Sequence, residues 1–430
     1  MPLVGSALPM VSDLLNTTRQ RVNRYGDISR IRLGPERGLL VVGSDSYRHV
    51  FTDTQQRFSA RFGYLNQLGR FYEGGLLLRD ADDHKAQRRI LQQAFKFTTM
   101  RDYVPRIERT LQTHIATWPG TGSTFHFYNY IKQALLDVAS EIFLGIPAED
   151  QRADFVASAF LDIASGLGSV LPWDLPGTPI RRGLRGRDRL HKYLRENLLN
   201  KRKQGAADMF SLLANARTDE GATFTDQEVI QHVAFLLFAA HDTTTSLLSH
   251  SAMYLGLYPE YQSRLREEYA RLAKNQLDWD SLDAMPSTQG FLDEVLRLHP
   301  PVPLMVRRTT TDIELGGYAI PAHTDLFMPS AYNQRDDRYW HAPDDFDPER
   351  FNDERAEHKQ HSFCFHPFGG GAHKCIGMHF AYMTGKVCLF HLLRESVLEL
   401  PSNFKPKLAW IPIPRPVNGP PITLRKEKIR

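Results

Sequence analysis

The segment between Thr225 and Pro259 constrains the fold of this chain more than any other feature, because it reads as one long helix. Thr225 followed by Glu228 has the form of a capping box, in which each side chain accepts a hydrogen bond from the other residue's backbone N–H. No proline interrupts the stretch before Pro259. A helix of about 33 residues is roughly 50 Å long, so this one is expected to cross the whole molecule.

The middle of this helix, AAHDTTTS at 239–246, is polar although apolar residues flank it. Threonine is a poor helix former, and its hydroxyl can bond back to the carbonyl four residues earlier and bend the helix. A buried helix accepts such residues when a functional group needs them. The alternative interpretation is a solvent-exposed face of threonine and aspartate.

The rest of the chain predicts a mainly helical fold with small β-sheets. Residues 28–33 and 39–43 have strand-like alternation bounded by glycine and proline, and 313–321 reads as a hairpin with Gly-Gly at its turn. No repeat, low-complexity linker or break in composition divides the sequence. We therefore expect a single domain over residues 1–430.

The charge balance and the cysteines narrow the class of protein. There are 53 basic and 49 acidic side chains, a net charge of +4, which does not predict a nucleic-acid-binding protein. Three cysteines without a CxxC spacing favour a reducing compartment. The N-terminus lacks signal-peptide features, and no stretch approaches the roughly 20 apolar residues of a membrane span. A cytoplasmic location without an integral membrane anchor is expected.

One cysteine, Cys375, lies in PFGGGAHKCIG (367–377) behind three consecutive glycines. It could be a buried structural cysteine, but Cys388 in an apolar helical stretch suits that role better. It could belong to a zinc site, although the spacing of the nearby ligands is irregular and lacks a CxxC pair. It could also be the thiolate ligand of a haem iron. The candidate zinc ligands are His361, Cys364, His366, His373 and Cys375.

Physical chemistry favours the haem ligand. Glycines allow unusual φ/ψ values and let a backbone approach a flat group closely. A helix is expected to begin at or just after Cys375, so that its free N–H groups and dipole stabilise a thiolate. His373, two residues earlier, is placed to contact a haem propionate.

The segment FGGGAHKCIG (368–377) resembles the haem-binding loop of the cytochrome P-450 family, whose pattern is F-G-x-G-x-(H/R)-x-C-x-G. Further motifs resemble that family in the expected order: HKAQRR (84–89), AAHDTT (239–244), EVLR (294–297) and PERF (348–351). The resemblance covers nearly the whole chain. It implies the cytochrome P-450 fold, with the haem between the long central helix and the cysteine loop and its helix.

The resemblance implies haem b (iron protoporphyrin IX) as the cofactor. Cys375 is then the axial iron ligand, and Phe368, His373 and Gly377 contact the haem from the same motif. Ala239 is expected over the haem plane, where a small side chain leaves room for oxygen and substrate.

Basic side chains are expected to hold the haem propionates. His84 and Arg88 are four residues apart and share a helix face. Arg307 stands where the family usually has a propionate-binding arginine, and its neighbour Arg308 is the alternative.

Asp242 and Thr243 correspond to the acid–alcohol pair that supplies protons for O–O cleavage in the family. The family usually has glycine at the position of Ala240, so the extra methyl group could narrow the oxygen groove. His241 is assigned no role.

Three charged residues are expected to form a structural clamp beneath the haem loop. Glu294 and Arg297 lie on one helix face, and Arg350 can add a second two-pronged contact to the same carboxylate.

Electrons are expected to come from a separate ferredoxin and ferredoxin reductase, because no flavin or nicotinamide domain is recognisable. A basic patch could dock the acidic partner, although a merely solvated helix face explains the same charges. The patch residues are Lys85, Arg89, Lys96, Lys374 and Lys386.

The resemblance implies a monooxygenase that inserts one oxygen atom from O2 into a C–H bond. Loops at 61–78, 155–180, 301–306 and 410–419 are apolar and aromatic, which favours a lipophilic small-molecule substrate. The stretch 171–188 resembles the branch that oxidises sterols, retinoids and terpenoids, and long-chain fatty acids are the second choice.

Two alternatives use the same haem-thiolate site. One is a ligand-binding sensor, but a sensor needs no proton relay such as Asp242–Thr243. The other is a peroxide-driven peroxygenase, a class that commonly lacks this pair. A zinc-stabilised binding protein would be colourless, which a purified sample shows at once.

Overall fold

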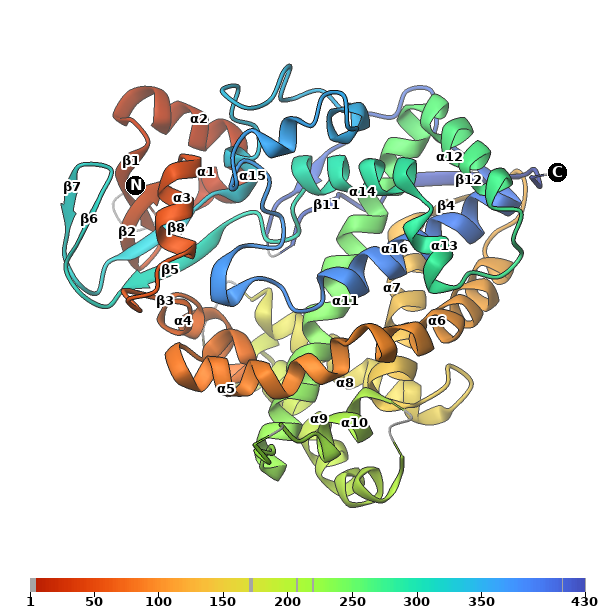
Figure 1. Ribbon diagram of the computed structural model, residues 1–430, viewed down its shortest axis with the longest axis horizontal. Helices are drawn as coiled ribbons and strands as arrows, with labels where there is room; N and C mark the ends of the chain where they lie inside the picture. Colours follow the sequence, from red (N-terminus) through yellow and green to blue (C-terminus); the bar gives the residue numbers. More distant parts are fainter. Residues whose placement is uncertain (1–4, 170–172, 206–207, 219, 412, 430) are drawn as a thin grey trace.

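The computed structural model describes residues 5–169, 173–205, 208–218, 220–411 and 413–429. Helices dominate and the sheets are small, as predicted (Figure 1). The α-helices are α1 (Ala7–Ser12), α2 (Leu14–Tyr25), α3 (Ser44–Phe51), α4 (Ala60–Tyr72), α5 (Ala81–Leu91), α6 (Phe97–Thr117), α7 (Phe127–Ala139), α8 (Gln151–Leu167), α9 (Pro179–Lys203), α10 (Met209–Asn215), α11 (Asp226–Leu257), α12 (Pro259–Leu272), α13 (Trp279–Asp283), α14 (Pro286–Leu298), α15 (Ser330–Asn333) and α16 (Met378–Glu395).

Short helical turns and strands complete the structure. The turns are η1 (Leu76–Leu78), η2 (Gln92–Phe95), η3 (Ser140–Leu144), η4 (Pro348–Phe351), η5 (Glu357–Lys359) and η6 (Gly371–His373). The strands are β1 (Ile28–Leu33), β2 (Glu36–Val41), β3 (Phe58–Ser59), β4 (Thr124–His126), β5 (Met305–Thr309), β6 (Ile313–Leu315), β7 (Tyr318–Ile320), β8 (Asp325–Met328), β9 (Ser396–Glu399), β10 (Leu408–Ala409), β11 (Arg415–Pro416) and β12 (Pro421–Lys426).

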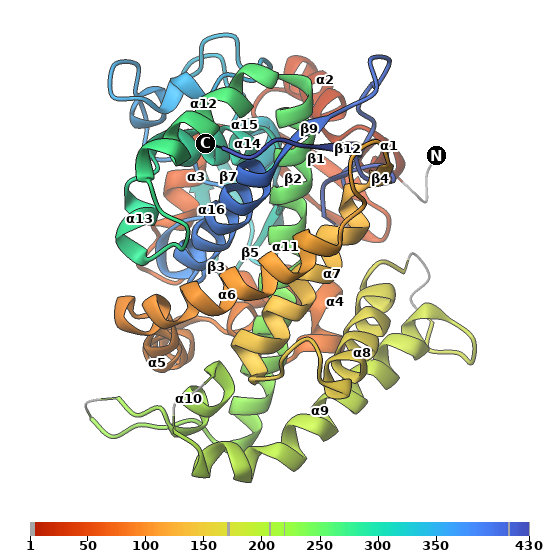
Figure 2. The same ribbon diagram turned by 90° about the vertical axis from the view of Figure 1, so that its right-hand side faces the viewer.

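Helix α11 begins as the capping box predicts and runs through the middle of the molecule (Figures 1 and 2). Glu228 N–H donates to Thr225 Oγ1 over 3.3 Å, and Thr225 N–H donates to Glu228 Oε2 over 2.8 Å. The helix ends at Leu257, and Pro259 opens α12. Most of its middle is buried, so other elements pack against this part of the helix on several sides.

The largest sheet has the strand order β1-β2-β8-β5-β3. Its β1–β2 pair is antiparallel with Ile28 opposite Val41, whereas β2 and β8 are parallel. The strand predicted at 28–33 is confirmed, and the one predicted at 39–43 begins earlier and ends at Val41. This sheet holds β5, and thereby fixes where the side chains of Arg307 and Arg308 lie.

The predicted hairpin at 313–321 is confirmed as β6–β7. Gly316 and Gly317 have φ values of +58° and +79°. A two-residue turn between antiparallel strands favours a left-handed conformation at both central positions, which glycine adopts without strain.

The main hydrophobic core gathers side chains from Phe71 to Leu424 around α11. The single-domain organisation of residues 1–430 and the cytoplasmic location stay predictions. Within the described ranges, no helix is both long and apolar enough to cross a membrane.

Two of the four predicted substrate-facing loops, 61–78 and 155–180, are largely helical. Residues 61–78 lie mainly in α4 and η1, and much of 155–180 lies in α8. Residues 170–172 and 412, which fall within the predicted segments, lie outside the described residues. Gly63 is needed within α4, because a Cβ atom there would lie 2.9 Å from the Val306 carbonyl oxygen.

Candidate haem-binding and catalytic site

Cys375 lies in a tight loop that leads into α16. Its backbone N–H donates to Phe368 O over 2.9 Å, and Gly369 N–H donates to His366 O over the same distance. Helix α16 begins at Met378 with Gly377 as its N-cap, just after Cys375 as predicted. The loop is therefore closed by its own backbone hydrogen bonds.

The Cys375 side chain is accessible to solvent, yet protein surrounds it closely. Burial raises the pKa of this thiol, whereas the Gly377 N–H and the charges of Arg88 and Lys374 lower it; the net shift is upward. The Gly377 N–H at the start of α16 favours the thiolate, as expected, but burial outweighs it. A coordinated metal cation keeps a thiol deprotonated, so an iron ligand suits this position.

Two of the three consecutive glycines have a reason that the sequence did not reveal. A Cβ atom on Gly371 would lie 1.7 Å from the Phe51 carbonyl oxygen, and one on Gly370 would lie 2.4 Å from the Phe363 ring. These two glycines are needed for packing against other parts of the protein. Gly377 differs, because a Cβ atom there would meet protein no closer than 3.8 Å, at Phe95. Space beside Gly377 fits the approach of a non-protein group such as haem.

Several residues in the middle of α11 are partly accessible, and the space beside them is called the opening below. Residues 232–237 and 244–253 are buried, whereas Phe238, Ala239, Ala240, Asp242 and Thr243 are partly accessible. The alternative interpretation, a solvent-exposed face of threonine and aspartate, is therefore not formed, because Thr244 and Thr245 are buried. Helix α16, which follows the Cys375 loop, packs against α11.

The threonines bond back along the helix as predicted. Thr243 Oγ1 donates to Ala239 O over 2.7 Å, and Thr244 Oγ1 donates to Ala240 O over 2.8 Å. The Thr243 hydroxyl proton is thus engaged in a hydrogen bond to Ala239 O, and the hydroxyl oxygen can accept a hydrogen bond from the opening.

Asp242 is held in a positively charged setting. Burial raises its pKa, but the hydrogen bond and charge of His241 and the charges of Lys132 and Arg415 outweigh burial, so the pKa falls below its usual range. The nearest titratable neighbour is His241, with Nδ1 3.1 Å from Asp242 Oδ1. His241, which was assigned no role from the sequence, is therefore part of this site, and only the fold reveals it.

His84 on α5 and His373 on the Cys375 loop are brought together. Their ring centroids are 3.9 Å apart, and His373 Nε2 lies 3.5 Å from Asp80 Oδ1. Burial, followed by the charges of His373 and Arg88, lowers the pKa of His84 to about 3. His84 Nε2 is buried without a hydrogen-bond partner. Such an orphaned nitrogen fits an acceptor group such as a propionate supplied by a cofactor.

Arg307 and Arg308 point to different surroundings because neighbours in a strand alternate faces. Arg308 makes two hydrogen bonds to Asp325, of 2.6 and 2.8 Å. Arg307 is buried and lies over the Phe51 ring. After burial and nearer groups, its charge further lowers the pKa values of His84 and His373. Burial lowers the pKa of Arg307. Arg307, and not Arg308, thus belongs to the cluster with the two histidines.

The zinc alternative does not match the geometry. Cys364 is buried with its thiol directed at the backbone of Glu357 and His358, and His366 bonds to Phe363 O and Ser330 Oγ. Across the part of the chain that the structure describes, no three His, Cys, Asp or Glu residues form a cluster that could hold a metal ion.

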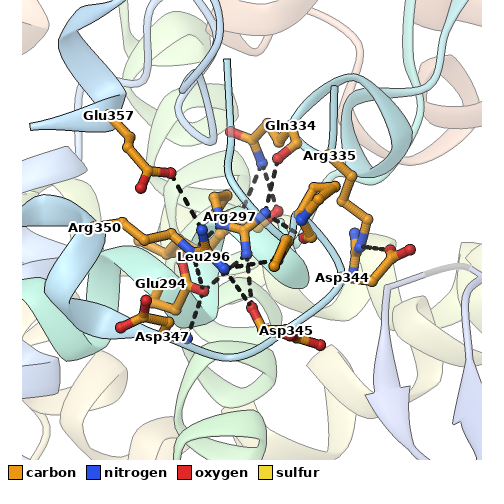
Figure 3. A network of polar contacts seen from close by, with 12 residues as sticks. Glu294, Leu296, Arg297, Gln334, Arg335, Asp344, Asp345, Asp347, Arg350 and Glu357 are labelled. Carbon is orange, nitrogen blue, oxygen red and sulfur yellow. Dashed lines mark hydrogen bonds and ion pairs between the residues drawn. The ribbon is translucent and has the colours of Figure 1, made fainter. Parts of the chain in front are cut away.

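Glu294, Arg297 and Arg350 meet in one buried cluster, as predicted (Figure 3). Arg297 reaches both oxygens of Glu294, at 2.6 and 2.8 Å, and all three side chains are buried. Arg350 makes one contact to Glu294, of 3.1 Å, and not the predicted second two-pronged one. Its remaining nitrogens bind Glu357 and three backbone carbonyls, those of His341, Ala342 and Asp345.

The predicted basic docking patch loses one member. Lys386 is buried and donates to Leu282 O over 2.8 Å, so it is not available to a partner. Lys85, Arg89, Lys96 and Lys374 are exposed, and the first two pair with Asp82 and Glu220.

The family model described as cytochrome P-450 matches residues 1–416. The chain belongs to the cytochrome P-450 family. Two relatives and one solved structure illustrate the likeness. A Mycobacterium tuberculosis protein provisionally named cytochrome P-450 136 is 34% identical over 392 residues, which is 90% of this chain and 80% of the relative. Sterol 14-demethylase of Arabidopsis thaliana is 28% identical over 422 residues, 95% of this chain and 86% of that protein.

The structure of a cyanobacterial CYP120A1 with bound retinoic acid matches this cytochrome P-450 with a TM-score of 0.90. The two are 27% identical, and the match covers 99% of this chain and 98% of the other. The predicted fold is therefore confirmed. Membership makes the protein an oxidoreductase of the monooxygenase class, and the family implies a haem iron.

Proposed function

We propose that this cytochrome P-450 hydroxylates a lipophilic small molecule of sterol, retinoid or terpenoid type, with long-chain fatty acids as the second choice. The likeness to a retinoic-acid-bound structure over almost the whole chain carries the proposal. A relative named sterol 14-demethylase supports the same substrate range.

Haem b fits the residues that the fold brings together. Cys375 would be its axial ligand, Ala239 would lie over it, and Phe368 and Gly377 would lie beside it. His84, Arg88, Arg307 and His373 would hold its propionates, because guanidinium and imidazole groups favour carboxylates. Bound haem supplies the activation of O2 that C–H hydroxylation requires.

Asp242 and Thr243 would deliver protons to the reaction. The pKa of Asp242 is lowered, chiefly by His241 against burial, and its side chain is partly accessible, so it can exchange protons with solvent and with the opening. The Thr243 oxygen accepts a hydrogen bond from a protonated group in the opening while its own proton stays on Ala239 O.

Electrons would come from a ferredoxin and a ferredoxin reductase. The exposed Lys96 and Lys374, with Lys85 and Arg89, offer positive charge on the same part of the chain as α5 and the Cys375 loop. Opposite charge accelerates association with an acidic partner.

An optical titration of the haem-loaded protein tests the substrate class. Retinoic acid, lanosterol, a cyclic terpenoid and palmitic acid are added in turn, because displacement of water from ferric haem shifts the spectrum from low to high spin. A saturable shift with one of the first three supports the proposal. A shift with palmitic acid alone supports the second choice and contradicts the sterol, retinoid or terpenoid assignment, and no shift with any of the four contradicts both.

The proton relay is tested by Thr243→Ala, with Thr244→Ala as the matched control. Both threonines bond to the carbonyl four residues earlier, but only Thr243 borders the opening. Thr243→Ala should raise the peroxide released per O2 consumed by about tenfold, and Thr244→Ala should not. Equal peroxide release from both variants and the native protein would contradict the relay.

A further inference from the structure

His241 is a buried histidine whose two ring nitrogens face different partners. Its Nε2 lies 2.9 Å from the backbone carbonyl oxygen of Lys132 on α7. Its Nδ1 lies 3.1 Å from Asp242 Oδ1, off the ideal hydrogen-bond direction, and has no other partner. The side chain has no exposed surface and packs edge-on against Phe160 of α8. The imidazole is therefore fixed between α7, α8 and the Asp242 carboxylate.

The hydrogen bond to Lys132 decides which nitrogen carries a proton. A carbonyl oxygen only accepts, so Nε2 must be the N–H donor. In a neutral ring, Nδ1 then has a lone pair, which would face an ionised carboxylate oxygen at 3.1 Å. Two acceptors at that distance repel each other unless a proton lies between them. The contact is favourable only if His241 and Asp242 share a proton.

We propose that His241 is the positioning residue of the proton relay: anchored on the Lys132 carbonyl, it orients Asp242 and shares one exchangeable proton with it beside the opening. The proposal rests on the relay through Asp242 and Thr243 proposed above. No bond other than O–H and N–H changes, because the shared proton passes to Asp242 and is replaced from solvent.

The groups around Asp242 suit this role. Lys132 and Arg415 both act on it electrostatically, and both lie by the ring of Tyr128, over distances of 5.7 and 5.8 Å. From α4, Tyr72 is close enough for Asp242 to raise its pKa further, after burial has done so. The Tyr72 hydroxyl is buried without a hydrogen-bond partner. Positive charge thus lies on one side of Asp242 and a neutral phenol on another.

Two substitutions separate the two contacts of His241. In His241→Gln the amide nitrogen replaces Nε2, so the bond to Lys132 O can persist while the group beside Asp242 is lost. In His241→Asn the amide nitrogen replaces Nδ1, so a donor to Asp242 remains and the Lys132 bond is lost. His250→Asn is the control, because His250 is another buried histidine of α11 whose Nδ1 bonds to Ser246 O.

The first readout is the protonation of Asp242 by infrared difference spectroscopy of the haem-loaded protein. The carboxylic acid C=O band of Asp242 is identified by its absence in Asp242→Asn. In His241→Gln this band should develop at a pH higher by about one unit than in the native protein. In His241→Asn and in the control His250→Asn, the band should develop at the same pH as in the native protein.

The second readout is the peroxide released per O2 consumed without substrate. His241→Gln should raise this peroxide release several-fold, by up to about tenfold. His241→Asn should release an amount of peroxide much closer to that of the native protein. If His241→Asn is impaired and His241→Gln is native in both readouts, the histidine only ties α11 to α7, and the proposal is wrong.

Thr243→Ala separates this proposal from the relay itself. Peroxide release raised by Thr243→Ala but unchanged by His241→Gln overturns the role of His241 alone. If Thr243→Ala has no effect, the relay fails, and the infrared titration still decides whether His241 controls Asp242. If His241→Gln does not take up haem, nitrogen NMR of histidine-labelled protein decides instead, with His241 assigned by its loss in His241→Asn. A bare Nδ1 beside an ionised Asp242 would overturn the proposal.

Discussion

Cys375 and Cys388 show how position gives one residue type two chemical environments. Cys388 is enclosed in the apolar middle of α16, and burial raises the pKa of its thiol to about 12. Cys375 is accessible, and near it lie the Gly377 N–H and the charges of Arg88 and Lys374. Thiolate ligands need such positive or hydrogen-bonding surroundings, so only Cys375 is suited to a metal.

Cys375→Ser should abolish the thiolate-type spectrum of the ferrous carbonyl complex. A serine hydroxyl is a far weaker ligand than a thiolate for iron, so the bond is lost while the volume is nearly kept. Cys364→Ser is the control, since that thiol faces only backbone carbonyls. A thiolate spectrum retained in Cys375→Ser would remove this residue as the ligand.

At the scale of elements, the Glu294 clamp joins α14 to the segment from Trp340 to Glu357. Arg297 also donates to the carbonyls of Gln334, Pro343 and Asp345 (Figure 3). Because these charged side chains are buried, the loss of any one partner leaves a charge without compensation in the protein interior. The clamp therefore fixes a long irregular segment that has little regular hydrogen bonding of its own.

Arg297→Lys should lower the free energy of unfolding by about 2–4 kcal/mol, because buried acceptors left without a hydrogen bond cost about 1–3 kcal/mol each. A lysine has the charge but not the planar fork that reaches both Glu294 oxygens and three carbonyls. Denaturant unfolding measures the change. Lys192→Gln, which removes an exposed pair with Glu196 on α9, should change stability by less than about 1 kcal/mol. Equal losses in the two variants would contradict the clamp.

A second polar contact between elements predicts a dependence on pH. Asp293 of α14 is buried and accepts from Tyr382 of α16 over 2.5 Å, and burial raises its pKa to about 6. The folded protein therefore binds a proton that the unfolded chain, with a pKa of about 3.9, does not. Stability from this group is present at low pH and is lost as pH rises from about 4 to about 6.

Asp293→Asn should remove this loss, because an amide stays neutral and its oxygen still accepts from Tyr382. Unfolding free energies at pH 5 and pH 7 measure it. The native protein should lose on the order of 1 kcal/mol more than the variant between these values. The same pH dependence in both proteins would show that Asp293 is ionised throughout.

At the scale of the whole molecule, the proposed haem site is built from parts that are far apart in the sequence. Helix α5, the middle of α11, strand β5 and the loop before α16 each contribute residues. None of these parts is complete without the others. A cofactor that contacts all of them would join the sheet region to the helical region.

Removal of haem should destabilise the protein by about 4 kcal/mol or more, if the cofactor is present at a thousand times its dissociation constant. Amides of α5 and residues 368–377 should exchange with solvent faster in the haem-free protein. The β6–β7 hairpin, which projects at the edge of the molecule (Figure 1), is the internal control. Uniform acceleration across the chain would mean that haem stabilises the fold without contacting these segments.

The sequence by itself determined the features that depend on local order. The capping box set the start of α11, Gly316 and Gly317 set the β6–β7 turn, and the motif around Cys375 indicated the family. Such signals are readable because the interacting groups lie within a few residues of one another.

Only the tertiary structure decided which groups meet across long stretches of chain. Arg308 is bound by Asp325, whereas Arg307 lies beside the two histidines. Close contacts with Phe51 and Phe363 require glycine at two positions of the Cys375 loop. His241 acquires its position from the carbonyl of Lys132, 109 residues away. These partners come from segments that become neighbours only when the core packs around α11, so no local sequence pattern could predict them.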